Sequence, residues 1–160
     1  MLMWCYIMAF CKKCFRHFAI RRKRTLSAAV GQRGERLAAR FLENAGYDIL
    51  ARNYAAPHGA GEIDIVARSR SGRLCFVEVK TRRVHPGRTW SLRPASAVDE
   101  AKRRRLRRSA YCWRRSVGTR KEAPCRFDIV EVWADGLRPR WLKHWAEAFP
   151  VSPEKPSSRN

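Results

Sequence analysis

The sequence predicts an α/β domain built on a mixed β-sheet, for three reasons. Residues 28–46 carry apolar side chains at the spacing of one helix face. Three strand-like segments follow with short polar connections between them, which is typical of an antiparallel meander. A second helical segment then leads to a further strand, and a helix between two strands allows them to pair in parallel.

Each element has its own signal in the sequence. The first helix ends at Gly46, which suits the left-handed residue that follows many helices. The second helix is expected at about 95–114, after a polar connection that contains Pro and Gly. The expected strands are alternating or apolar segments, at residues 47–54, 62–68, 73–82 and 125–133, with a fifth candidate at 140–145.

The chain of 160 residues is long enough for one domain, which we place at residues 25–149. Residues 1–24 form an extension in which an apolar segment precedes a basic one, the reverse of a secretory signal. The apolar segment is shorter than the roughly 20 residues that span a bilayer, so no transmembrane segment is expected. Residues 150–160 are rich in Pro and Ser and are expected to be disordered.

The charge of the chain is strongly unbalanced. It has 35 Lys and Arg against 14 Asp and Glu, a net charge of +21. Such an excess favours a polyanionic partner. Nucleic acid is the first candidate, because each cation that contacts a phosphate releases a condensed counterion. An anionic membrane surface, bound through residues 1–24, is the second.

The six cysteines show no spacing typical of a disulfide framework. We therefore expect free thiols in a reducing compartment, and a cytoplasmic protein. Cys11 and Cys14, with Cys5 and His17 nearby, form one C-x-x-C pair. A single pair without a second one is a weak signal for zinc.

Charged residues lie inside two of the expected strands, where an uncompensated charge costs free energy. Glu78 and Lys80 are two residues apart and share a face of their strand. If residues 70–72 form a three-residue hairpin loop with a left-handed Gly72, Asp64 lies directly opposite Glu78. A two-residue loop would instead place Asp64 opposite Val79. On the first register the two carboxylates predict a divalent cation site, with Mg²⁺ the leading candidate.

Two helical residues can join this cluster. Glu35 lies at the margin of the first helix's apolar stripe, and Lys102 falls on the apolar stripe of the second helix. The alternative is that Asp64 and Glu78 are solvated residues of an edge hairpin, with Lys80 in a cross-strand ion pair. On that alternative Glu35 is an ordinary surface residue and Lys102 extends its ammonium past the stripe into water.

Five segments resemble one family in order and content: GQRGERLAARFLENAGYDILARNY, GEIDIVA, FVEVKTR, AVDEAKRRRL and CRFDIVEV. Over residues 28–133 they resemble the YraN family, which is assigned to the PD-(D/E)XK nuclease superfamily and is related to archaeal Holliday-junction resolvases. The resemblance implies a restriction-endonuclease-like core. It also implies a homodimer as one arrangement, since resolvases cut two equivalent strands.

The resemblance also implies roles for individual residues. Asp64, Glu78 and the carbonyl of Val79 correspond to the ligands of Mg²⁺ or Mn²⁺, and Lys80 corresponds to the catalytic lysine. Glu35 matches the glutamate of the first helix in resolvase-like members. Lys102 matches a position that often contacts the substrate phosphate.

A basic segment, residues 102–116, supplies a candidate nucleic-acid surface. On a helix, five arginines are expected to face away from the apolar stripe: Arg103, Arg104, Arg107, Arg114 and Arg115. With Arg82, Arg83 and the connection that follows them, these residues are expected to contact a phosphate backbone without reading its sequence.

The first functional hypothesis is therefore a metal-dependent endonuclease that hydrolyses phosphodiester bonds of DNA, branched DNA included. The second is a non-catalytic nucleic-acid-binding module with the same fold. The third is a cationic peripheral membrane protein that binds through residues 1–24.

Overall fold

The computed structural model describes residues 27–83, 98–118, 123–135 and 138–152. Residues 1–24, with Cys5, Cys11, Cys14 and His17, lie outside the described residues. So does the connection after Arg83, whose side chain is not described either. The predictions made for these segments, and for most of the tail at 150–160, therefore stay predictions.

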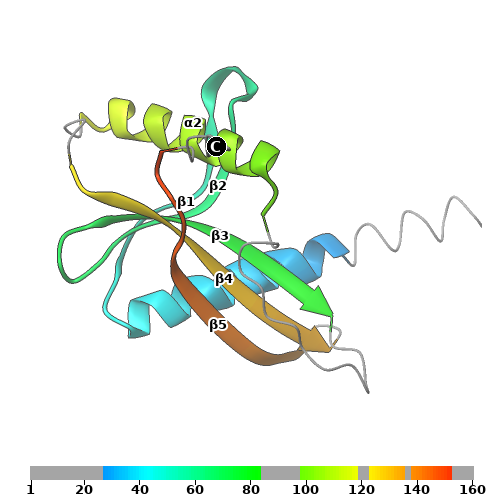
Figure 1. Ribbon diagram of the computed structural model, residues 1–160. Coiled ribbons are helices and arrows are strands. Elements are labelled where there is room, and N and C mark those ends of the chain that lie inside the picture. The colour runs from blue at the N-terminus through cyan, green and yellow to red at the C-terminus, as the bar shows by residue number, and fades with distance from the viewer. Residues whose placement is uncertain (1–26, 84–97, 119–122, 136–137, 153–160) are drawn as a thin grey trace, which may run out of the picture.

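A five-stranded mixed sheet lies between two helices (Figure 1). The strands are adjacent in sequence order, and every pair is antiparallel except β3–β4. The first helix covers one face and α2 covers the other. The predicted α/β architecture is confirmed, including the meander and the parallel strand after the crossover. In chain order the elements are the first helix (27–44), β1 (Asp48–Ala56), η1 (Pro57–Gly59), β2 (Gly61–Arg68), β3 (Leu74–Arg83), α2 (Glu100–Ser116), β4 (Cys125–Asp135) and β5 (Arg138–Phe149).

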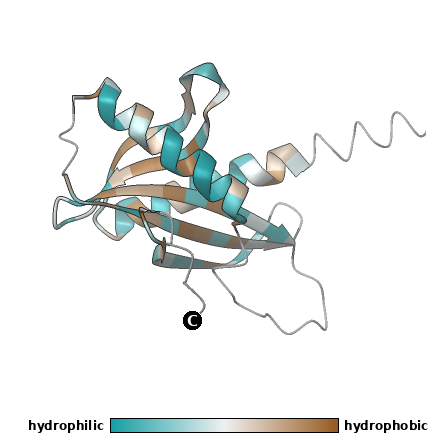
Figure 2. Ribbon diagram, turned by 45° about the horizontal axis from the view of Figure 1, so that its top comes forward, coloured by the Kyte–Doolittle hydropathy of each residue, from teal (hydrophilic) through white to brown (hydrophobic). Residues whose placement is uncertain are grey.

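Two hydrophobic layers hold the sheet and helices together. On the α2 side, Phe76 and Phe127 pack with Leu106 of the helix. On the other side, Val77 and Val130 pack with Leu42 of the first helix. Alternate residues of the central strands enter opposite layers, as expected for strands buried on both faces. Figure 2 shows the result, with hydrophobic residues concentrated on the central strands and hydrophilic residues along α2.

The ends of both helices follow from local chemistry. At the end of the first helix, Gly46 N–H donates to the Glu43 carbonyl and Tyr47 N–H donates to the Leu42 carbonyl. Gly46 has φ +83°, so this is a Schellman motif and the predicted helix end is confirmed. The second helix begins at Glu100 rather than near 95, because the Asp99 side chain accepts from Lys102 N–H at 2.7 Å and caps the helix there.

The β2–β3 hairpin has the predicted three-residue loop. Ser69 N–H donates to the Arg73 carbonyl at 2.9 Å, and Gly72 has φ +80°. The ladder then pairs Arg68 with Leu74 and continues to Ile65 opposite Val77. This register brings Asp64 toward Glu78, which was the prediction on which the candidate site depended.

Candidate active site

Asp64 and Glu78 meet at the point where the backbone ladder between β2 and β3 ends. The last paired residues are Ile65 and Val77, and Asp64 and Glu78 come next in the same register. Asp64 does not continue the ladder with its backbone. Its carboxylate Oδ2 accepts the backbone N–H of Val79 at 2.6 Å instead. An acidic side chain thus occupies the opening between the two strands.

Glu78 is buried between two lysines that come from different elements. Lys80 Nζ lies 2.9 Å from Oε1, and Lys102 Nζ lies 3.0 Å from Oε2. The Glu78 side chain is only 4 % exposed, whereas the two lysines are 33 % and 26 % exposed. The lysines therefore lie on the solvent side of a buried carboxylate. Both predicted positions, Lys80 on β3 and Lys102 on α2, are brought together with Glu78.

The electrostatics of Asp64 differ from those of an exposed aspartate. Burial, and then the negative charge of Glu78, raise the pKa of Asp64 from 3.8 to about 6. Donation from Val79 N–H and the charge of Lys102 act in the opposite direction, and Glu35 adds a further increase. The raised pKa of Asp64 therefore reflects burial first and the neighbouring negative charge of Glu78 second.

Glu35 belongs to the first helix, on the opposite face of the sheet from α2, yet its charge acts on Asp64. Close packing of this helix on β3 explains its position. A Cβ at Gly34 would overlap Thr81 Oγ1 of β3, so only glycine permits this approach. Three of the four predicted catalytic residues, Asp64, Glu78 and Lys80, are therefore gathered at one end of the β2–β3 pair, and the charge of Glu35 reaches Asp64 from the first helix.

The residues present fit a divalent cation. Glu78 Oε2 is buried, and its contact is the partly exposed ammonium of Lys102 at 3.0 Å, a cation in the place where a metal could bind. Val79 N–H points toward Asp64, and in a strand the carbonyl of the same residue points to the same side. Asp64, Glu78 and the Val79 carbonyl thus offer the oxygen donors that Mg²⁺ prefers. No cluster of three or more His, Cys, Asp or Glu side chains with metal-site spacing occurs among the described residues, so water or substrate oxygens would complete the shell.

Glu131 of β4 is a buried acid that the sequence reasoning missed. It pairs with Lys80 in the parallel β3–β4 register and is 3 % exposed. Arg82 Nε donates to Oε1, and Trp145 Nε1 donates to Oε2, each at 3.1 Å. The sequence did contain a signal for it, because Glu131 stands inside an apolar strand segment, as Glu78 does. Arg82, predicted to bind nucleic acid, is 47 % exposed and carries this internal ion pair.

The arginines of α2 divide into two groups, which corrects the expectation that five of them face solvent. Arg103 and Arg107 lie over the ring of Phe149, and Arg107 also donates to the Pro150 carbonyl. Arg114 donates to the Ala123 carbonyl. These three attach the helix to the end of β5 and to the approach to β4. The exposed arginines of the helix are Arg104, Arg105, Arg108 and Arg115.

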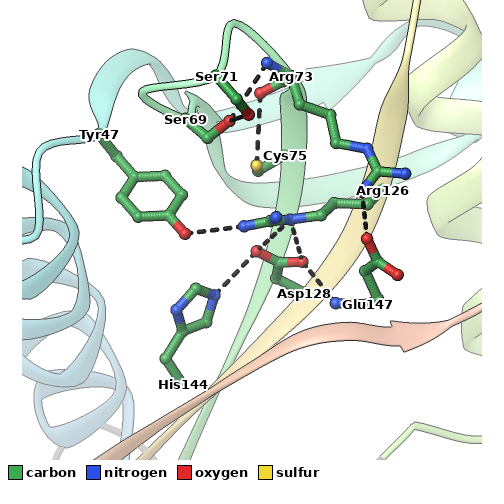
Figure 3. A network of polar contacts seen from close by, with 9 residues as sticks. All are labelled: Tyr47, Ser69, Ser71, Arg73, Cys75, Arg126, Asp128, His144 and Glu147. Carbon is green, nitrogen blue, oxygen red and sulfur yellow. Dashed lines mark hydrogen bonds and ion pairs between the residues drawn. The ribbon is translucent and has the colours of Figure 1, made fainter.

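A second polar network lies on the face of the sheet that the first helix covers (Figure 3). Asp128 is fully buried and accepts from Arg126, from the Glu147 N–H at 3.0 Å, and lies 2.8 Å from His144 Nε2. Arg126 in turn donates to the Tyr47 hydroxyl. The network joins β4 to β5 and to the end of the first helix. Its satisfied hydrogen bonds indicate a structural role.

Cys75 lies beside the Asp128 network. Burial, and then the charge of Asp128, raise the pKa of Cys75 to about 11. Its thiol therefore stays protonated and is a poor nucleophile. Cys75, Cys112 and Cys125 are all free, as the sequence predicted.

The fold is that of an α/β protein with a five-stranded mixed sheet, which is compatible with a restriction-endonuclease-like core. The chain belongs to the uncharacterised protein family UPF0102, the YraN family, whose model matches residues 34–132. The predicted family membership is thus confirmed. No helix in the described segments is long and apolar enough to cross a membrane.

Relatives from several organisms carry the same family name. A UPF0102 protein of Symbiobacterium thermophilum is 48 % identical over 107 residues, which cover 67 % of this chain and 84 % of the relative. One from Koribacter versatilis is 43 % identical over 109 residues, covering 68 % and 71 %. One from Moorella thermoacetica is 46 % identical over 105 residues, covering 66 % and 81 %.

Proposed function

We propose that this protein is a metal-dependent nuclease that hydrolyses phosphodiester bonds of DNA. One observation carries the proposal. Asp64 and Glu78 converge from neighbouring strands, and Lys80 and Lys102 contact the same glutamate. Buried acids and lysines gathered in this way suit hydrolysis of a charged ester better than they suit a purely structural role.

The donor set described above would hold Mg²⁺ or Mn²⁺ through Asp64, Glu78 and the Val79 carbonyl. Such an ion, when bound, activates water and neutralises charge on the phosphoryl oxygens. Lys80 Nζ, which lies 2.9 Å from Glu78 Oε1, would orient the attacking water and stabilise the negative charge of the transition state. Lys102 Nζ has the position to bind a non-bridging phosphate oxygen.

The exposed arginines of α2 extend the same positive surface. Arg104, Arg105 and Arg108 are exposed, and no ion pair to a described carboxylate involves them. With the net charge of +21 they favour a phosphate backbone held by charge and shape. Lys102 and Arg105 also line a hollow of about 440 Å³ with Gly59, Gly61 and Glu62, next to the candidate site.

A non-catalytic DNA-binding module is the second candidate, and one observation favours it. Each carboxylate oxygen of Glu78 already lies within ion-pair distance of a lysine, so the glutamate is neutralised without a metal. Such a protein would bind DNA through the same arginines and would cleave none.

The two candidates differ in a cleavage assay with linear, flapped and branched DNA in Mg²⁺ or Mn²⁺. Wild type is compared with Asp64→Ala, Lys80→Gln and Lys102→Gln, with Asp135→Ala, an exposed acid of β4, as the matched control. A nuclease loses cleavage in Asp64→Ala and loses about 10²–10³-fold in kcat in Lys80→Gln. In Lys102→Gln the KM rises more than kcat falls. Equal cleavage by wild type and Asp64→Ala indicates a contaminant, and binding without any cleavage supports the second candidate.

A further inference from the structure

A second basic surface lies on the side of the sheet away from α2. Three arginines of the first helix, Arg33, Arg36 and Arg40, are spaced three and four residues apart and therefore share one helix face. Together with Arg52 of β1 they line a hollow of about 440 Å³. Among the described residues that line it, Glu43 is the only acid.

The four guanidinium groups in this hollow make no ion pair within the part of the chain that the structure describes. All four side chains are also exposed. This distinguishes them from Arg103 and Arg107 of α2, which the fold itself uses. Four like charges around one concavity repel each other unless an anion lies between them, and guanidinium groups bind phosphate oxygens in a bidentate manner.

The hollow adjoins the candidate active site. Arg52 pairs with Ile65, the residue next to Asp64, and the hollow and the site lie on opposite faces of the sheet at this point of β1 and β2. Arg36 also follows Glu35, whose charge acts on Asp64. Strand β1 is an edge of the sheet and lies beside both the hollow and the candidate active site. The first helix lies on one face of the sheet and α2 on the other (Figure 1).

We propose that the hollow lined by Arg33, Arg36, Arg40 and Arg52 binds the phosphate backbone of the nucleic-acid substrate, so that the substrate straddles the edge strand β1. The inference rests on the proposed function, because it assigns a further contact to the same substrate. Nucleic acid is favoured over a lipid surface because the arginines line a concavity between a helix and a strand edge, which admits a chain of phosphates more readily than a flat bilayer.

The test is the salt dependence of DNA binding with Ca²⁺ in place of Mg²⁺, so that cleavage does not interfere. Wild type is compared with Arg36→Gln/Arg40→Gln, with Arg104→Gln/Arg108→Gln, and with the fourfold variant. The matched control is Arg68→Gln/Arg70→Gln, which removes two exposed charges at the β2–β3 hairpin. Thermal melting of each variant verifies that it is folded, as expected for exposed residues replaced by glutamine.

We expect the Arg36→Gln/Arg40→Gln variant to lower the slope of log Kd against log salt by about two, one for each lost phosphate contact. The slope also falls by about two in Arg104→Gln/Arg108→Gln, and by about four in the fourfold variant, because one substrate occupies both surfaces. The hairpin control leaves the slope within about one of wild type.

Several results would overturn the inference. If the hairpin control weakens binding as much as Arg36→Gln/Arg40→Gln does, the hollow contributes only net charge. If only the α2 variant weakens binding, the hollow is not a DNA contact, while the proposed function stands. If wild type binds no DNA at all, the proposed function fails and this inference fails with it. If Arg36→Gln/Arg40→Gln weakens binding to phosphatidylserine vesicles and leaves DNA binding unchanged, the hollow binds a membrane surface instead.

Discussion

The carboxylate of Asp64 accepts the backbone N–H of Val79 at 2.6 Å, where a backbone carbonyl of β2 would otherwise be expected. This contact fixes the acid in the opening between two strands and directs it toward Glu78. Burial at this position disfavours the ionised form of Asp64, and the first prediction follows from the free energy that this ionisation costs.

Asp64→Asn is expected to stabilise the metal-free protein at neutral pH. The folded state raises the pKa of Asp64 from 3.8 to about 6, so it binds the proton more tightly than the unfolded state does. The free energy of unfolding of wild type therefore falls as pH rises from about 4 to about 6, relative to the variant, and the difference is constant above that range. A shift of this size corresponds to at most about 3 kcal/mol.

The measurement is urea unfolding of both proteins in EDTA at several pH values. Asparagine keeps an oxygen for the Val79 N–H and is neutral throughout, so the difference between the two curves isolates the ionisation of Asp64. Parallel curves from pH 4 to pH 8 would show that Asp64 ionises in the folded protein as it does in the unfolded chain.

Divalent cations are expected to offset that difference in stability. A ligand that binds only the folded state stabilises it by about 2.7 kcal/mol at one hundred times its Kd. Mg²⁺ or Mn²⁺ should thus raise the Tm of wild type, by roughly 2–8 °C for each kcal/mol of stabilisation. Asp64→Asn should show no such increase. Differential scanning fluorimetry measures it, with Asp135→Asn as the control, because Asp135 is 61 % exposed on β4.

Gly34→Ala is expected to destabilise the fold although alanine favours helices. The new methyl group would overlap Thr81 Oγ1 and would separate the first helix from β3, at a cost of about 1–3 kcal/mol. Adding Thr81→Ala to the Gly34→Ala variant removes that oxygen and should restore part of the lost free energy of unfolding. Gly31→Ala is the matched control, since nothing lies within 4 Å of its added carbon and the helix should gain up to about 1 kcal/mol. Chemical unfolding of all four proteins compares them directly.

Asp128→Asn should have the opposite effect to Asp64→Asn, although both remove one buried charge. Asp128 faces Arg126 and His144, and its neutralisation leaves Arg126 without its counter-ion inside the fold. Removal of one partner of a buried pair costs about 3–5 kcal/mol. The same unfolding experiment at pH 7 measures it. A loss below about 1 kcal/mol would mean that the network in Figure 3 contributes little beyond an exposed ion pair.

The sequence predicted the parts of this protein that depend on local geometry. A three-residue loop with Gly72 at its end determines the β2–β3 register, so the meeting of Asp64 and Glu78 followed from two residues of turn chemistry. Helical spacing likewise placed Lys102 on the buried stripe of α2. Each of these two predictions needed the geometry of only one helix or one hairpin.

The features that were missed depend on contacts between distant segments. Arg103 and Arg107 leave the solvent face because Phe149 and Pro150, at the end of β5, lie beneath them. The arginine hollow likewise needs the first helix and β1 together. Helical periodicity describes which way a side chain points from its own axis, and it contains no information on what a later strand brings beside it.

Strand β4 is buried on both faces: Phe127 and Ile129 enter the α2 layer, while Val130 and Val132 enter the layer of the first helix. A nascent chain cannot close either layer before residues 125–135 have left the ribosome. Until then the β1–β3 meander presents an unpaired apolar edge, which favours aggregation. Ribosome-bound chains that stop short of Cys125 are therefore expected to be held by chaperones, and the whole domain to consolidate late and in one step.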